Sequence, residues 1–348
     1  MPSLDALRAA LDATPRLPLA VLPTPLQDLP RLRAALGGPG RCPRILAKRD
    51  DLTGLGLGGN KARKLEFLMA DARRAGAATV VTTGAAQSNH ARMTAAAARV
   101  AGLRAVLVLT SRQVNPPLEG NLLLDRLFGA DVRFVPALDP MLAVGDDGPV
   151  VEAVVRDERE AGRHAYVIPV GGSSAIGALG YVSATLELAG QLAAIGESPS
   201  RLYYASGSRG TQAGLTLGAR LTAAPYRLYG VAVSAGEPEK AVRARRVANE
   251  AAAALGVAER VEPADLVTDQ AYIGDGYGVP TPGALEAIRL LAETEAILLD
   301  PTYSAKAMAA LVHHVRAGDI HPDESVVFLH TGGAPALFTA SFAAAWSR

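Results

Sequence analysis

The chain has 348 residues, and its 35 lysine and arginine residues nearly balance its 34 aspartate and glutamate residues. This balance leaves no broad basic surface for nucleic acid or an anionic membrane, so we expect neither partner. The single cysteine, Cys42, excludes a disulfide framework within one chain and is typical of a cytoplasmic protein.

The N-terminal residues predict a short helix followed by an extended arm. Residues 3–13 have the spacing of an amphipathic helix, with Ser3 as its cap. Five prolines then interrupt residues 15–30. Charged residues break up the apolar positions of residues 1–19, unlike a signal peptide, and no apolar run reaches the roughly eighteen residues of a membrane span.

Strands and helices alternate from residue 44 onwards. Strands are expected over residues 44–48, 79–83, 105–110, 131–135 and 165–170. The helices between and after them are expected over residues 62–75, 89–101, 118–128 and 150–161. Such alternation predicts parallel strands in a doubly wound α/β arrangement.

The same pattern begins again after Gly171 and Gly172. Further strands are expected over residues 201–205, 226–233 and 326–330. Further helices are expected over residues 176–195, 237–255, 283–295 and 304–316, directly after residues 206–211, and at the C-terminus. We therefore predict two open parallel-sheet domains, a large one formed by residues 1–54 and 169–348 and a small one formed by residues 55–168.

Residues 58–66 (Gly-Gly-Asn-Lys-Ala-Arg-Lys-Leu-Glu) place Lys61 at the start of a predicted helix. The helix dipole disfavours a cation there, and a neutral lysine can form a Schiff base. The alternative is an ordinary first-turn lysine with its ammonium group in water. These nine residues alone favour that alternative, because short motifs often match by chance.

Three loops rich in small and polar residues lie between a strand and a helix, at residues 83–90, 206–211 and 330–334. Ligands of open α/β sheets bind at such strand ends, although each loop alone could be an ordinary tight turn. Residues 206–211 suit a phosphate group, yet both the Walker motif and the dinucleotide fingerprint are missing. One phosphate and a reactive lysine together indicate pyridoxal 5′-phosphate (PLP).

Several motifs, taken together, resemble the D-cysteine desulfhydrase / 1-aminocyclopropane-1-carboxylate (ACC) deaminase family. They occupy residues 59–66, 87–90, 171–173, 276–280, 300–303 and 330–333. The resemblance runs in order from about residue 22 to the C-terminus. It implies the fold of the tryptophan-synthase-β-like, fold-type-II PLP enzymes, with PLP in the cleft between two domains.

The resemblance also implies which residues hold the cofactor. Lys61 would bind PLP covalently, either Asn60 or Asn89 would bind its ring hydroxyl, and Thr331 would face its pyridine nitrogen, with Gly332 beside it. The loop at residues 206–211 would hold the phosphate. The phosphate-binding residues would be Ser206, Gly207, Ser208, Arg209, Gly210 and Thr211.

The substrate-binding residues implied by the resemblance are Gln87, Ser88, Asn89, Tyr277 and Tyr303. Gln87, Ser88 and Asn89 would bind the substrate carboxylate, and the two tyrosines would flank the substrate. The implied catalytic residues are Lys61, as base at the α-carbon, Ser88, as a proton carrier, Tyr277 and Tyr303. We interpret His90 and His330 as packing residues, because no set of metal ligands surrounds them.

The function that the resemblance implies is PLP-dependent β-elimination from a small amino acid, in a protein expected to form a homodimer. D-cysteine is the first candidate substrate, giving pyruvate, hydrogen sulfide and ammonia. The alternatives are 3-chloro-D-alanine, L-cysteate with release of sulfite, deamination of ACC, and a non-catalytic PLP carrier.

Three residues depart from the family pattern. Ser304 stands where ACC deaminases have glutamate and desulfhydrases usually have threonine, which favours the desulfhydrase branch. Arg209 replaces a glycine and would either contact the phosphate or point into solvent. Ser174 replaces an asparagine. These changes imply a substrate pocket that differs from the usual one.

Overall fold

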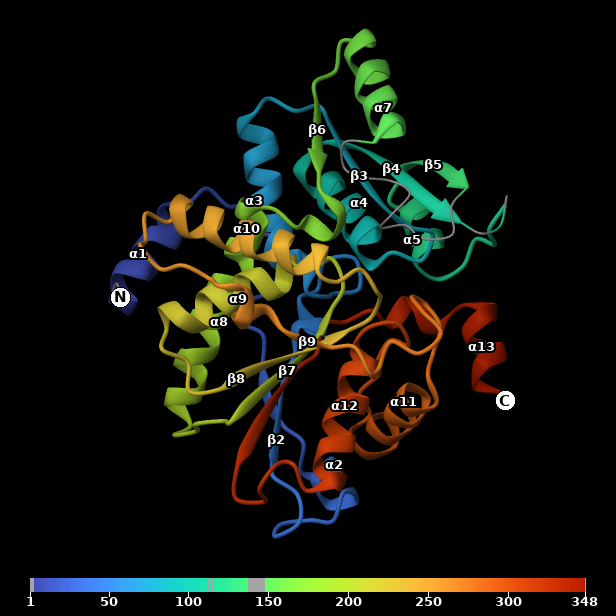
Figure 1. Ribbon diagram of the computed structural model, residues 1–348. Helices are drawn as coiled ribbons and strands as arrows, with labels where there is room; N and C mark the ends of the chain where they lie inside the picture. The colour runs from blue at the N-terminus through green and yellow to red at the C-terminus, as the bar shows by residue number, and fades with distance from the viewer. Residues whose placement is uncertain (1–2, 112, 114, 137–147, 348) are drawn as a thin grey trace.

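The computed structural model describes residues 3–111, 113, 115–136 and 148–347 and contains two open sheets (Figure 1). The six-stranded sheet has the order β1 (Leu26–Asp28), β2 (Arg44–Lys48), β10 (Ser325–Leu329), β7 (Arg201–Ser206), β8 (Arg227–Ala232) and β9 (Thr268–Asp269). The four-stranded sheet has the order β5 (Asp131–Pro136), β4 (Arg104–Ser111), β3 (Thr79–Ala85) and β6 (Ala165–Ile168). All described pairings are parallel except β1 with β2.

Helices cover both faces of the six-stranded sheet. In β7, Tyr203 packs in one core with α11 (Pro282–Glu295) and α12 (Ser304–Ala317). Its neighbours Leu202 and Tyr204 belong to the opposite core with α8 (Ala175–Ala194). Burial on both faces explains why the central strands are apolar throughout.

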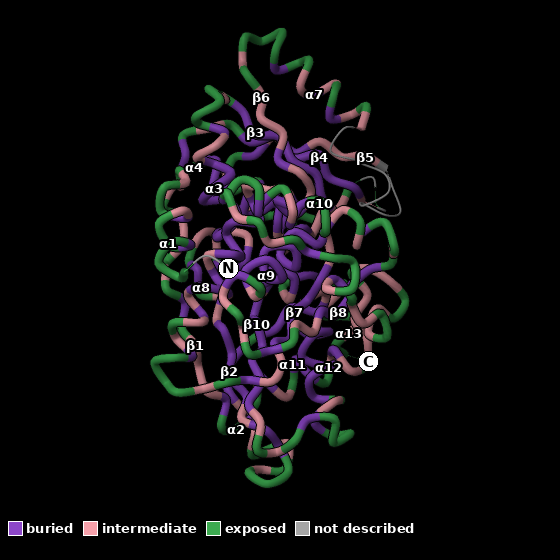
Figure 2. Tube along the Cα trace, turned by 60° about the vertical axis from the view of Figure 1, so that its left-hand side comes forward, coloured by how far each residue is buried: buried purple, intermediate pink, exposed green. Residues whose placement is uncertain are grey.

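Further helices complete the large-sheet side of the molecule. They are α1 (Leu4–Ala13), α2 (Pro30–Ala35), α9 (Gly210–Leu221), α10 (Glu239–Ala254) and α13 (Ala340–Trp346). Figure 2 shows the buried residues concentrated along the strands and along α8 and α9. No helix of the described ranges has both the length and the apolar character that a membrane span needs.

The four-stranded sheet is also covered on both faces. Val80, Leu107 and Leu109 pack with α3 (Lys61–Arg74) and α4 (Asn89–Ala101). Val81 and Val106 pack on the other face with α7 (Pro149–Glu160). The helix α5 (Gly120–Leu127) precedes the edge strand β5.

The prediction of parallel sheets in an α/β fold is confirmed, with local differences in the arm and in one edge. The proline-rich arm is not wholly extended, since α2 begins at Pro30, and its residues 26–28 form the strand β1, which was not predicted. The two-residue strand β9 was not predicted. The proposed domain boundaries at residues 54 and 168 remain a prediction, because α3 packs against α8 as well as α4.

A buried network of charges fixes α3 against the large sheet. Arg63, which is 1% exposed, donates to both carboxylate oxygens of the fully buried Asp50 at 2.8 and 2.9 Å. It also donates to Glu187 at 2.8 and 3.0 Å. Lys48 pairs with Glu187 as well, and Tyr181 donates to Asp50 at 2.7 Å. Because buried charges are costly unless they are paired, this network holds the start of α3 in a defined position.

Candidate active site

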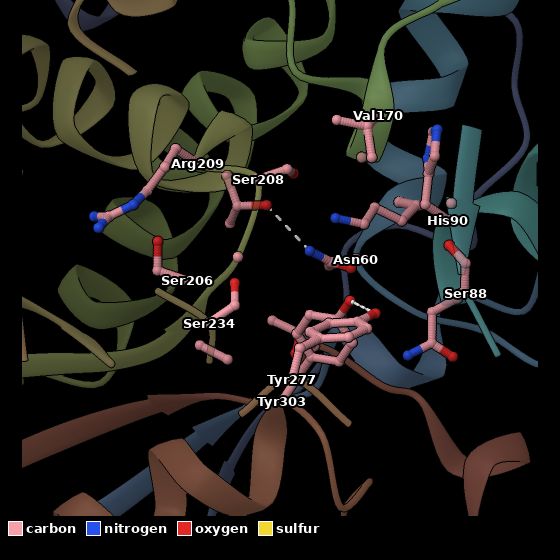
Figure 3. Close-up of a pocket in the computed structure, with 18 of the residues that line it drawn as sticks. Asn60, Ser88, His90, Val170, Ser206, Ser208, Arg209, Ser234, Tyr277 and Tyr303 are labelled. Atoms are coloured by element: carbon pink, nitrogen blue, oxygen red, sulfur yellow. Dashed lines mark hydrogen bonds between the residues drawn. The ribbon is translucent and has the colours of Figure 1, made fainter. Parts of the chain in front are cut away.

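A cavity lies where strands of both sheets reach their carboxyl ends (Figure 3). It is lined by residues that end or follow β3, β6, β7, β8 and β10, and by the start of α3. The three predicted loops therefore meet at one site, as expected for ligands of open α/β sheets. The lining residues are Asn60, Lys61, Gly84, Ala85, Ser88, Asn89, His90, Val170, Gly171, Ala205, Ser206, Gly207, Ser208, Arg209, Thr211, Gln212, Ser234, Tyr277, Tyr303 and Thr331.

Lys61 is the first residue of α3 and lines the cavity. Burial lowers the pKa of its ammonium group to about 8. Desolvation in the cavity wall lowers the pKa of Lys61, whereas the sequence analysis predicted a neutral lysine from the helix dipole. A lysine with this pKa is partly neutral near pH 8, as a Schiff-base lysine requires.

Lys64 was not predicted as a site residue, yet it lies beside the phosphate-binding loop. It is fully buried, and its Nζ donates to the carbonyl oxygen of Gly171 at 3.0 Å. Burial, and then the charge of Lys61, lowers its pKa well below the usual value, with no acidic side chain opposing the shift. Its position three residues after Lys61 on the same helix face could have indicated this role. A buried lysine beside this loop, without an acidic partner among the described residues, favours an anionic ligand that would supply the counter-charge.

Two buried donors, one in the loop at residues 206–211 and one directly after it, have no partner among the described residues. Gln212 accepts from Ser206 Oγ at 3.1 Å and from Arg209 Nη1 at 2.5 Å, which leaves its Nε2 without a partner. Arg209 is 2% exposed, so the alternative of a solvent-directed side chain is wrong. Its Nη2 donates to Thr268 at 2.7 Å and pairs with Glu237, and its Nε has no partner. Both unpaired donors belong to cavity-lining residues and suit a phosphate group.

Close backbone packing shapes the same loop. A Cβ atom on Gly210 would lie 2.7 Å from the Cα atom of Ser173 and 2.9 Å from Lys64 Nζ. Glycine therefore lets α9 begin directly against the Gly171–Gly172 turn and the buried lysine. A Cβ atom on Gly171 would lie 2.0 Å from Ser208 Oγ. These contacts explain why the Gly-Gly-Ser motif and the phosphate loop, far apart in sequence, form one cradle.

The loop after β3 forms the opposite side of the cavity, where Figure 3 shows Ser88 and His90. Ser88 caps α4 by accepting from the amide of Ala91 at 3.2 Å. His90 contacts Thr82 Oγ1 at 2.8 Å through Nε2, and burial lowers its pKa well below the usual value. Gln87 does not line this cavity, since its side chain bonds to Glu119 and Asn121.

Tyr277 and Tyr303 form a third wall. Their hydroxyl oxygens are 2.5 Å apart and their rings meet edge to face. Burial, followed by the neighbouring Tyr277, raises the pKa of Tyr303 well above the usual value. Tyr303 therefore stays protonated at neutral pH, and its hydrogen bond with Tyr277 occupies one of the two hydroxyl protons of the pair.

The segment that follows β10 is hydrogen-bonded to Asn60, the residue before Lys61. The amide of Asn60 donates to the carbonyl oxygen of Thr331 at 3.0 Å, and Asn60 Nδ2 donates to Thr211 at 3.1 Å. Thr331 lines the cavity, whereas Gly332 packs behind it, where a Cβ atom would lie 2.7 Å from the Cα atom of Gly59. His330 bonds to the carbonyl oxygen of Leu298 at 3.0 Å, as a packing residue would.

The other two departures from the family pattern do not line the cavity. Ser304 is 1% exposed and donates to Asp300 Oδ1 at 2.7 Å. Ser174 caps α8 by accepting from the amide of Gly177 at 3.2 Å. Ser304 and Ser174 therefore do not form part of the pocket wall themselves.

The site combines a partly neutral lysine, a loop at a helix N-terminus that suits a phosphate group, and a pocket lined by hydroxyl groups. A PLP-dependent enzyme needs these three features. A family model described as "Pyridoxal-phosphate dependent enzyme" matches residues 17–332, and the chain belongs to this family. It is a PLP-dependent enzyme. The unpaired donors of Arg209 and Gln212 and the buried Lys64 fit the phosphate of this cofactor.

Within the family the chain is similar to proteins named D-cysteine desulfhydrase. It is 44% identical to that of Salmonella choleraesuis (strain SC-B67) and 43% identical to that of Salmonella paratyphi C (strain RKS4594), in each case over 329 residues, 93% of this chain and 95% of the relative. A crystal structure of an ACC deaminase homologue is 38% identical, with a TM-score of 0.84 and 97% of both chains covered. The processed form of threonine deaminase isoform 2 from Solanum lycopersicum, 17% identical over 99% of this chain and 87% of its own, has a TM-score of 0.66 and shows the shared fold.

Replacement of Arg209 tests whether its Nε contacts the phosphate. A charge-assisted hydrogen bond contributes roughly 1.5–3 kcal/mol, so Arg209→Gly should weaken PLP affinity by about one to two decades. Glycine suits the backbone here, because φ at this residue is 72°. The measurement is PLP titration of the apoprotein, with Arg260→Gly at an exposed loop position as the control. Unchanged PLP affinity would show that Arg209 does not bind the phosphate and only makes contacts within the protein, such as those with Glu237 and Thr268.

Proposed function

We propose that this enzyme is a β-eliminating lyase for a small amino acid, with D-cysteine as its substrate. D-cysteine and water would give pyruvate, hydrogen sulfide and ammonia. The observation that carries the proposal is the cavity itself, in which Lys61, Ser88 and the Tyr277–Tyr303 pair surround one small space beside the phosphate cradle. The similarity to proteins named D-cysteine desulfhydrase supports the choice of substrate.

Residues of α3 and α4, of the loop that leads into α9 and of the segment after β10 would hold the cofactor. Lys61 would bind it covalently through Nζ, and the loop at residues 206–211 would bind its phosphate together with Lys64 and Gln212. Thr331 would lie against the ring, and Asn60 or Asn89 would bind the ring hydroxyl. When bound, PLP withdraws electrons from the α-carbon of an amino acid and so makes its proton removable.

Lys61 would then serve as the base at the α-carbon. Its pKa of about 8 leaves a substantial neutral fraction near pH 8, and this fraction falls as the pH decreases. The substrate carboxylate would lie at the N-terminus of α4, against Ser88 and Asn89. An anion is favoured there because the first N–H groups of a helix lack partners within it.

The two tyrosines would assist the leaving group. Tyr303 retains its proton, because burial and Tyr277 raise its pKa. The hydroxyl of the bonded pair whose proton is not used between the two rings would donate a hydrogen bond to the sulfur atom as the Cβ–S bond breaks. Ser88 would help to move protons on the side of the cavity opposite the phosphate-binding loop, where Figure 3 shows it.

Deamination of ACC is the second candidate, supported by the ACC deaminase homologue of similar structure. ACC has no α-hydrogen, so opening its ring requires a group that acts on a ring carbon. The glutamate that the resemblance links to this branch is absent, and Ser304 points at Asp300 instead. D-cysteine is therefore the preferred substrate.

A substrate panel tests the proposal. Purified holoenzyme is expected to release pyruvate from D-cysteine and 3-chloro-D-alanine, as measured with a lactate dehydrogenase coupled assay, and to release little ammonia or 2-oxobutanoate, the four-carbon keto acid, from ACC. Comparable rates on ACC and D-cysteine would show that Ser304 does not discriminate between them. Activity on L-cysteate alone would make the enzyme a sulfo-lyase. A changed cofactor spectrum without pyruvate would support the non-catalytic carrier.

The proposal also includes a homodimer and a cytoplasmic location. The dimer follows from the family resemblance, and the location follows from the single cysteine, Cys42, which is buried. Light scattering of the purified protein measures the oligomeric state and so tests the proposed homodimer. The division into a domain of residues 55–168 and one of residues 1–54 and 169–348 belongs to the same proposal.

A further inference from the structure

Asn121 lies outside the cavity lining but is bonded to the loop that would bind the substrate carboxylate. It is the second residue of α5 and is fully buried. Its backbone amide donates to Gln87 Oε1 at 2.8 Å. Its Nδ2 donates to the carbonyl oxygen of Gln87 at 3.1 Å and to Asn89 Oδ1 at 3.0 Å. The side chain of Asn121 thus uses both of its N–H donors on this one loop.

The orientation of the Asn121 amide is determined by a buried arginine. Arg92, which is fully buried, donates through Nε to Asn121 Oδ1 at 3.0 Å. A guanidinium group can only donate, so the oxygen of the amide must face Arg92 and its nitrogen must face Asn89. Arg92 also donates to the carbonyl oxygens of Gly56 and Gly58, at 3.1 Å for Gly58. These hydrogen bonds hold the Arg92 guanidinium group in place. Arg92 therefore fixes the direction in which the oxygen of the Asn121 amide points.

The orientation of Asn121 in turn determines that of Asn89. Because Asn89 Oδ1 accepts from Asn121, its Nδ2 is the end that remains for the cavity. This nitrogen lies 2.8 Å from the position that a Cβ atom on Gly333 would occupy, so only glycine leaves it room. Asn89 then presents a donor, rather than an acceptor, to whatever binds there.

We propose that Asn121 is a positioning residue that fixes the Asn89 amide as a donor to the substrate α-carboxylate. This inference rests on the proposed function in requiring an α-amino acid ligand, but it does not depend on which leaving group is lost. It assigns Arg92 and Asn121 the task of selecting carboxylate-bearing amines. Neither residue would touch the substrate.

Asn121→Asp is the variant that tests this orientation. It has the same shape, and its carboxylate still accepts from Arg92, but it loses the bond to the carbonyl oxygen of Gln87, so circular dichroism should first show that the variant is folded. The new carboxylate cannot donate to Asn89 Oδ1. We therefore expect the Asn89 amide to rotate, to donate to the new carboxylate and to present its oxygen to the substrate carboxylate, which repels it. A matched control is Asn249→Asp, since Asn249 bonds to Val261 at both ends of its amide and lies outside the cavity lining.

Two ligands that differ in the carboxylate provide the readout. D-alanine has the α-carboxylate but no leaving group, and ethylamine is D-alanine without its carboxylate. Their dissociation constants are measured from the absorbance of the bound cofactor. In Asn121→Asp the value for D-alanine should rise at least about tenfold, the ratio expected for one lost charge-assisted bond, while that for ethylamine stays within about twofold. PLP affinity and the control variant should not change.

A double-mutant cycle separates positioning from a general structural defect. In an Asn89→Ala background, Asn121→Asp should add little to the D-alanine effect, because the residue through which it acts is gone. An equal loss for both ligands, or a loss of PLP affinity, would overturn the inference, as would a wild-type enzyme that does not favour D-alanine over ethylamine. If wild-type enzyme does not convert D-cysteine but this difference between ligands remains, the proposed substrate fails and the positioning role stands.

Discussion

Lys61→Ala should lose the covalently held cofactor and reduce turnover by a factor on the order of 10³ or more, since the amine would serve both as attachment point and as base. The neighbouring Lys64 should not replace it, because its Nζ donates to the carbonyl oxygen of Gly171 and Lys64 does not belong to the residues that line the cavity. The measurement is pyruvate release together with PLP retained after gel filtration.

Lys61→Arg is the matched variant for this experiment. It keeps a cation and a similar volume at the start of α3, but its guanidinium group cannot form the covalent bond. Both variants should remain folded by circular dichroism, and both should be inactive. Turnover within tenfold of wild type in either variant would contradict the role of Lys61.

Arg63→Met should lower the free energy of unfolding by about 3–5 kcal/mol, the cost of leaving a buried carboxylate without its partner. Asp50 is fully buried, and although burial alone would raise its pKa, Arg63 and Lys48 outweigh that effect and hold it below the usual value. Without Arg63 this carboxylate would take up a proton or remain as an uncompensated charge. Urea unfolding of the apoprotein measures the loss.

The pH dependence of this loss has a defined sign. A depressed carboxylate pKa stabilises the native state above the pKa of the unfolded chain, near 3.9, and this stabilisation disappears as the pH falls through the native pKa. The difference between wild type and Arg63→Met should therefore be largest near neutral pH and should narrow below about pH 4. The control is Arg316→Met, which breaks an exposed pair with Glu286 and should change stability little. Equal effects of the two substitutions would contradict the proposed importance of the buried network.

Most of the fold could be predicted because the central strands are buried on both faces. Residues such as Leu202, Tyr203 and Tyr204 form an apolar run that only a doubly covered parallel sheet accommodates. The strands β1 and β9 were missed because they span only three and two residues. Their pairing depends on the neighbouring strand rather than on their own sequence.

The site was predictable as far as strand ends and motifs determine it. The loops after β7 and β10 meet because these strands are neighbours in the six-stranded sheet, and the loop after β3 reaches the same cavity from the four-stranded sheet. The direction of long or buried side chains was not predictable. Arg209 pairs with Glu237, and Lys64 is buried although lysines in helices are usually exposed. Asn121 was missed because its bonds to Gln87 and Asn89 join residues about thirty positions apart.

Borohydride reduction of the holoenzyme, followed by peptide mapping, tests the central claim most directly. Reduction turns the bond between the lysine nitrogen and the cofactor into a stable amine that survives proteolysis. We predict that the pyridoxyl label will be found on Lys61 alone, because this amine lines the cavity and has a pKa of about 8. A label on Lys64, or the absence of any labelled lysine in an enzyme that still releases pyruvate, would contradict the account.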